Sequence, residues 1–89
     1  MRFEWDSDKA AANVKKHRVS FDEAVTLFYD PLAATFGDPD HSSDETRLVT
    51  VGYSARGHLQ VVCHVERGAA TRLISTRCAT ARERKRHEG

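Results

Sequence analysis

The sequence of 89 residues has little cysteine, no long hydrophobic run and no repeated or low-complexity segment. No apolar stretch approaches the roughly 18 residues of a membrane-spanning helix, so we expect no membrane partner. Two cysteines, Cys63 and Cys78, cannot build the disulfide framework of a small secreted domain. The charged start at residues 1–6 does not resemble a signal peptide. These features favour a cytoplasmic protein with reduced thiols.

Metal-ligand spacings are also missing, because neither a Cys-x-x-Cys nor a His-x-x-x-His pattern occurs. We therefore expect no metal and no other cofactor. The length indicates one domain over residues 1–89. A chain this short buries only about 60–65% of its unfolded surface, so its core is modest and a stabilising partner would suit it.

Charge is distributed unevenly along the chain. Residues 1–45 hold ten acidic and five basic side chains, whereas residues 46–89 hold three acidic and nine basic ones. Such asymmetry is typical of a protein with a positively charged binding surface. The alternative is that the two halves neutralise each other within the fold.

The hydrophobic pattern predicts an α+β fold. Asp6 or Ser7 caps a helix at 7–17, and the capping box from Ser20 to Glu23 begins a second helix at 21–29. Alternating patterns then predict a short edge strand at 2–5, four main strands at 33–37, 46–53, 58–65 and 71–77, and a polar loop at 38–45. We expect an antiparallel sheet of about four strands, two N-terminal helices on one face and a short basic C-terminal helix.

Arginines on the last strand and the terminal helix carry the strongest functional signal. The guanidinium group donates two parallel hydrogen bonds to phosphate and keeps its charge at any working pH. The arrangement therefore predicts contact with a nucleic-acid backbone. The candidate backbone-binding residues are Arg72, Arg82, Arg84, Lys85 and Arg86.

Side-chain alternation predicts how the sheet divides its residues between two faces. With tight turns at 54–57 and 66–69, one face is apolar and lies under the helices; it holds Leu48, Leu59, Val61, Cys63 and Ile74. The other face gathers Arg47, Tyr53, His64 and Arg77, with His87 approaching from the terminal helix. A shift of one residue in register would undo this grouping. The alternative is a solvated face with scattered polar residues.

An ordered set of residues along nearly the whole chain resembles the BrnT toxin family. The set comprises Trp5-Asp6, Lys9, Asn13, Lys16-His17, Val19-Ser20-Phe21, Glu23-Ala24, Phe28, Asp30-Pro31, Asp40-His41-Ser42, Arg47, Gly52, Ser54, Arg56-Gly57, His64, Glu66-Arg67, Ile74-Ser75, Arg77, Ala79-Thr80 and Glu83-Arg84. The resemblance implies a RelE-like ribonuclease fold and RNA cleavage that inhibits translation and growth. It also implies a BrnA-type ribbon-helix-helix antitoxin as partner, in a 2:2 complex that reaches operator DNA through the antitoxin.

Metal-independent cleavage of RNA requires a base, a group that stabilises charge on the phosphate, and an acid for the leaving oxygen. Arg77 and Arg47 suit the charge role, and His64 and His87 are candidates for proton transfer because histidine titrates near neutrality. The family often carries tyrosine where this chain has His87. Structural roles remain open for both histidines, and Lys16-His17 reads as a helix end. A noncatalytic RNA- or protein-binding module of the same fold is the alternative function.

Overall fold

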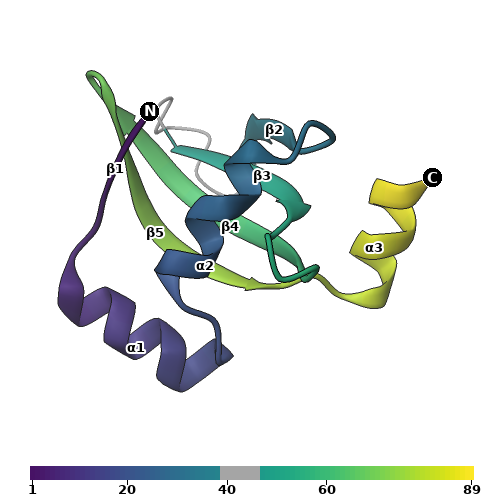
Figure 1. Ribbon diagram of the computed structural model, residues 1–89, viewed down its shortest axis with the longest axis horizontal. Coiled ribbons are helices and arrows are strands. Elements are labelled where there is room, and N and C mark those ends of the chain that lie inside the picture. The colour runs from purple at the N-terminus through teal and green to yellow at the C-terminus, as the bar shows by residue number, and fades with distance from the viewer. Residues whose placement is uncertain (39–46) are drawn as a thin grey trace.

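The computed structural model describes residues 1–38 and 47–89 and shows an α+β fold with one mixed sheet (Figure 1). Its elements are β1 (Arg2–Glu4), α1 (Ser7–His17), α2 (Phe21–Thr26), the 3-10 helix η1 (Leu27–Tyr29), β2 (Ala34–Gly37), β3 (Arg47–Tyr53), β4 (Leu59–Arg67), β5 (Ala70–Cys78) and α3 (Ala81–Glu88). The predicted α+β class is confirmed. Residues 39–46, which include most of the predicted 38–45 loop, lie outside the described residues. Across the described parts of the chain, every helix is too short or too polar to cross a membrane.

The sheet has five strands in the order β1-β5-β4-β3-β2, so the prediction of four antiparallel strands is wrong. The short segment predicted as an edge strand is β1, and it runs parallel to β5 with Glu4 opposite Arg72. The other pairings are antiparallel. The alternating pattern of residues 2–5 indicates a strand, but it carries no information about which distant strand will accept it.

The predicted helix starts are confirmed. The Asp6 carboxylate accepts hydrogen bonds from the backbone N–H groups of Asp8 at 2.8 Å and Lys9 at 3.2 Å. Ser20 Oγ accepts from Glu23 N at 3.1 Å and begins α2. Within residues 1–38 and 47–89, the Glu23 carboxylate does not accept the return hydrogen bond from Ser20 N. It turns instead toward Ser54 and His58 in the β3–β4 turn.

The two N-terminal helices do not share one face, contrary to the prediction. Figure 1 shows α2 lying across the sheet and α1 lying beside β5. Asn13, buried in α1, donates from Nδ2 to Thr76 O at 2.9 Å and accepts on Oδ1 from Thr76 N at 3.1 Å. The Asn13 side chain therefore takes the place of a neighbouring strand at the edge of β5, beyond Arg72, where the pairing with β1 ends. A third hydrogen bond, from Nδ2 to Val19 O at 2.9 Å, fixes the link between α1 and α2.

The core lies between α2 and the covered face of the sheet. It is formed by Phe21, Ala24, Leu27, Val62 and Leu73, with Phe3, Trp5, Ala10, Val25 and Phe28 packed around them. Apolar side chains spaced along one side of α2 and η1 supply half of this cluster. The sheet supplies few apolar residues to it, because most side chains on the covered face are polar.

Two shifts of one residue each change the predicted faces. The β3–β4 loop is longer than the predicted four residues, so Tyr53 pairs with Leu59. In β5, Ile74 is an extra residue at a bulge, so Leu73 shares a face with His64 as predicted, but Arg77 pairs with Val61. In both cases the partner on β4 lies one residue later in the sequence than predicted. As a result Arg47, Tyr53 and Arg77 still share a face, whereas His64 lies on the opposite one. The prediction that Leu59, Val61 and Cys63 lie under the helices is therefore wrong, because they share the face of Arg77.

We expect Asn13→Ala to lower the free energy of unfolding by roughly 3 kcal/mol, because three hydrogen bonds worth about 1 kcal/mol each are lost. Urea denaturation monitored by circular dichroism measures the change. The control is Lys15→Ala on the exposed side of the same helix, which we expect to alter stability by less than about 0.5 kcal/mol. Equal stability of the two variants would contradict the role assigned to Asn13.

Candidate active site

The face of the sheet turned away from α2 carries a broad groove of about 820 Å³. Its floor is apolar and comes from Val49 and Val51 on β3 and from Val61 on β4. Polar and charged side chains stand around this floor. The lining residues with charged, titratable or nucleophilic side chains are His17, Asp38, Cys63, Ser75, Arg77, Glu83, Arg86 and His87.

Arg77 stands at the end of β5 and forms the central ion pair of the groove. Its Nη1 and Nη2 atoms donate to the two carboxylate oxygens of Glu83 at 2.7 and 2.8 Å. The hydrogen bonds from Arg77 lower the pKa of Glu83 to about 2, and the same pairing raises the pKa of Arg77. Both groups therefore stay ionised at any working pH. The Arg77 side chain keeps about 40% of its surface exposed, which leaves room for a ligand.

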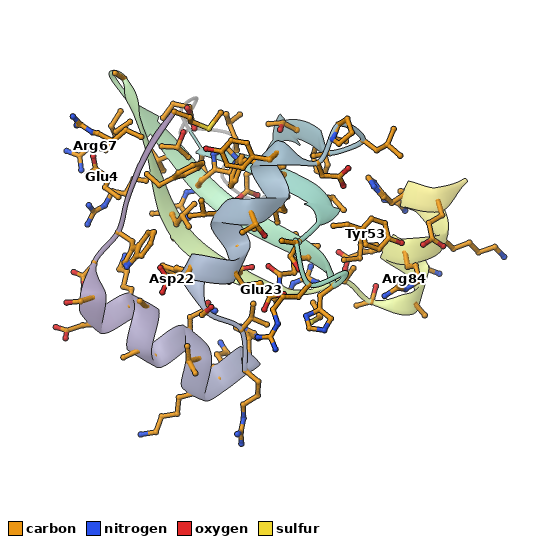
Figure 2. The ribbon with its side chains drawn as sticks, viewed as in Figure 1. Glu4, Asp22, Glu23, Tyr53, Arg67 and Arg84 are labelled. Atoms are coloured by element: carbon orange, nitrogen blue, oxygen red, sulfur yellow. The ribbon has the colours of Figure 1, made fainter. Side chains whose placement is uncertain are left out.

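The basic helix α3 is fixed to the sheet at both ends. Thr80 Oγ accepts from Glu83 N at 3.1 Å and Glu83 accepts from Thr80 N at 2.9 Å, so the two residues form a complete capping box at the start of α3. Near the other end, Tyr53 donates to Glu88 and accepts from Arg84 (Figure 2). The hydrogen bond to Glu88 raises the pKa of Tyr53. These contacts hold α3 against the end of the sheet, although none of its own residues is buried.

Two histidines line the same groove as Arg77. His87 comes from α3 and lies near Tyr53, with a ring separation of 6.1 Å. His17 ends α1 and reaches the groove because Asn13 binds that helix to β5. The sequence suggested His87 for this region but assigned His17 a structural role. The Lys16-His17 pair in the family resemblance was the one signal that pointed to His17.

The opposite wall of the groove is built by the turn before β2. Asp30 accepts hydrogen bonds from Tyr53 N at 2.8 Å and Leu32 N at 2.9 Å, and these two contacts, in that order, lower its pKa. Gly52 permits this approach, because a side-chain Cβ there would lie 2.9 Å from the Cβ of Ala33. The turn thereby projects Leu32 into the lining of the groove.

His64 is not part of this groove, so its predicted grouping with Arg77 is wrong. It lies on the face covered by α2 with 2% of its surface exposed. Its Nε2 is 2.7 Å from Thr50 Oγ1, its Nδ1 is 2.9 Å from Glu66 Oε2, and its ring packs edge-on against Phe28. Burial lowers the pKa of His64, although the contact with Glu66 opposes the change. The geometry is that of a core histidine.

The remaining predicted residues lie around and beyond the groove. Arg82, Arg84, Lys85 and Arg86 are exposed on α3, and Arg86 also lines the groove. Arg47 begins β3 on the same sheet face as Arg77. Arg72 pairs at 3.1 Å with Glu4, which Figure 2 shows at the far end of the sheet from α3. Within residues 1–38 and 47–89, no three histidine, cysteine, aspartate or glutamate side chains gather at a metal-binding distance.

A groove that holds Arg77 and two histidines thus lies on the open sheet face, next to a basic terminal helix. The sequence was then compared with models of protein families. Residues 5–83 match the model for the ribonuclease toxin BrnT of type II toxin–antitoxin systems. The chain belongs to the BrnT family. It is therefore a ribonuclease toxin of a type II toxin–antitoxin system, as the sequence resemblance indicated.

The fold is shared with a solved member of the BrnT family. The crystal structure of the Brucella abortus ribonuclease toxin BrnT superposes with a TM-score of 0.72 over 90% of this chain and 97% of that one. Sequence identity is 24%. A comparison with curated proteins finds no match. The arrangement of strands and helices is thus retained while most side chains differ.

We expect His64→Gln to change the pH dependence of stability and to leave RNA cleavage intact. Because the pKa of His64 is lowered on folding, its contribution is complete above histidine's ordinary pKa of about 6.5 and is lost as the pH falls toward the lower folded-state value. The variant does not titrate there, so its stability should fall less than that of the wild type. Denaturation at a series of pH values measures this difference. Loss of cleavage by a folded variant would contradict the assignment of His64 to the core.

Proposed function

We propose that this toxin is a metal-independent endoribonuclease that acts in the cytoplasm, where it cleaves RNA and so inhibits translation and growth. In this reaction the 2′-hydroxyl attacks the adjacent phosphate and the 5′-oxygen leaves. The groove on the open sheet face is the site of the reaction. The observation that carries this proposal is that Arg77, His17 and His87 line one groove although they come from three separate elements.

Arg77 stabilises the negative charge that develops on the phosphate. Its guanidinium is held in place before the substrate arrives, and preorganised donors of this kind supply much of an enzyme's rate enhancement. His17 and His87 are the proton-transfer groups, one as base and one as acid, since histidine changes charge near neutral pH. Arg47, on the same face of the sheet, adds positive charge for the incoming RNA.

The surroundings of the groove suit single-stranded RNA. Exposed cations along α3 attract the phosphate backbone. These cations are Arg82, Arg84, Lys85 and Arg86. The apolar floor accommodates unstacked bases, which a duplex does not offer. Phe36, half exposed at the rim, provides a ring on which a base can stack.

We expect Arg77→Ala to lower the rate of RNA cleavage by about 100- to 1,000-fold, the usual effect of removing a donor that stabilises transition-state charge. Arg77→Lys should also be strongly impaired, because lysine lacks the planar fork. Cleavage of a labelled single-stranded RNA by purified toxin in EDTA-containing buffer measures both effects. Wild-type activity under these conditions is required by the metal-independent mechanism.

The matched control is Arg67→Ala, since Arg67 is an exposed arginine of β4 that Figure 2 shows at the far end of the sheet from α3. It should retain wild-type cleavage. A fully active Arg77→Ala variant would show that the groove is not the reaction site. A wild-type protein that binds RNA without cleaving it would favour the noncatalytic module of the same fold.

We further propose that the partner is a BrnA-type ribbon-helix-helix antitoxin in a 2:2 complex, which contacts operator DNA through the antitoxin. The family membership supports an antitoxin partner, and the small core favours one. Co-expression with the neighbouring antitoxin gene should abolish growth inhibition and yield one complex whose mass by light scattering equals two copies of each chain. A toxin that elutes alone beside its soluble antitoxin would contradict this proposal.

A further inference from the structure

The hydrogen bonds of Arg77 leave one side of its guanidinium available. Nη1 and Nη2 together hold the two oxygens of Glu83, and Nη1 also donates to Cys78 O at 3.3 Å. Nε–H and the second N–H of Nη2 lie side by side along the other edge of the group. Within residues 1–38 and 47–89 these two donors have no hydrogen-bond partner. They form a fork of the geometry that binds two oxygens of a phosphate.

Glu83 is itself held firmly. Its Oε1 accepts from Arg77 Nη1 and from Thr80 N at 2.9 Å, while Oε2 accepts from Arg77 Nη2. It also occupies the third position of α3, so the helix start fixes its backbone. The carboxylate therefore joins the beginning of α3 to the guanidinium at the end of β5. Any rotation of Arg77 would break two charge-assisted hydrogen bonds.

We propose that Glu83 is a positioning residue for RNA cleavage: it fixes the guanidinium plane of Arg77 so that the free Nε/Nη2 fork meets the reacting phosphate. This inference rests on the proposed function, in which Arg77 stabilises the phosphate. Glu83 does not touch the substrate. It restricts the long, flexible side chain of Arg77 to one orientation. Such restriction matters because a misplacement of about 1 Å can cost about 100-fold in rate.

The charge of Glu83 gives this role a distinctive kinetic signature. A negative charge beside Arg77 weakens the attraction of the groove for RNA, so it opposes binding while it assists the chemical step. Removing it should leave KM unchanged or lower it, and should reduce kcat. A side chain that only stabilises the fold would not produce this division between KM and kcat.

The test is Glu83→Gln, which keeps the size of the side chain and its ability to complete the helix cap. The amide has one acceptor oxygen and an NH2 group that cannot accept from Arg77, so the bidentate pairing is lost. We expect kcat to fall about 10- to 100-fold with KM equal to or below the wild-type value. Glu83→Asp keeps the charge but not the reach, so its kcat should fall with KM unchanged.

The matched control is Glu4→Gln, which removes the carboxylate that pairs with the other ion-paired arginine of β5, Arg72, at 3.1 Å. It should keep wild-type kcat and KM. This variant separates the loss of any arginine–carboxylate pair on β5 from a misplaced Arg77 guanidinium.

A double-mutant cycle decides whether Glu83 acts through Arg77. In the Arg77→Ala background, measured at high enzyme concentration, Glu83→Gln should cause no further loss. A further loss equal to that in the wild-type background would overturn the inference, as would wild-type kcat in Glu83→Gln. If Arg77→Ala is inactive and Glu83→Gln is fully active, the positioning role alone is wrong. If Arg77→Ala is active, the proposed reaction site is wrong as well.

Discussion

The register of β5 decides which residues form the groove. Ile74 is an extra residue in this strand, so the side chains before it and after it pair differently with β4. Without the bulge, Arg77 would lie on the face covered by α2 and could not meet a ligand. Asn13 holds the strand just beyond the bulge through both backbone groups of Thr76. One buried amide on α1 thus supports the conformation that exposes Arg77.

The polarity of the two sheet faces is the reverse of the usual arrangement. The covered face holds buried polar side chains that bind one another, among them Thr50, Gln60, His64 and Thr76. Glu23 extends this network, since its Oε2 accepts from Ser54, His58 and Gln60. Burial acts to raise the pKa of Glu23, but the hydrogen bonds from Ser54 and His58 together with nearby positive charge outweigh it, so the pKa is lowered. Satisfied polar groups of this kind specify one packing of α2 on the sheet. The apolar valines are left for the groove floor, where a ligand can cover them.

Helix α3 supplies residues to the groove, and residues of the sheet beside the groove hold α3 in place. No residue of α3 is buried, so apolar packing does little to hold the helix. Its place is set by Arg77 at one end and Tyr53 at the other. The residue that we assign to phosphate stabilisation therefore also anchors the helix that carries the cations we assign to RNA binding. In the proposed mechanism, RNA binding and the chemical step are coupled through a single carboxylate, that of Glu83.

The sequence by itself determined the local elements: the starts of all three α-helices, the strands and the basic character of α3 follow from caps and periodicity between neighbouring residues. It also predicted that Arg47, Tyr53 and Arg77 share a face, and this held because the two register shifts compensate each other. Only the tertiary structure decided the parallel partner of β1, the position of α1, the exclusion of His64 and the inclusion of His17. These depend on a single residue in a loop or bulge, or on contacts across more than 60 residues such as that between Asn13 and Thr76. A side-chain pattern with a period of two fits either register, and long-range packing selects between them.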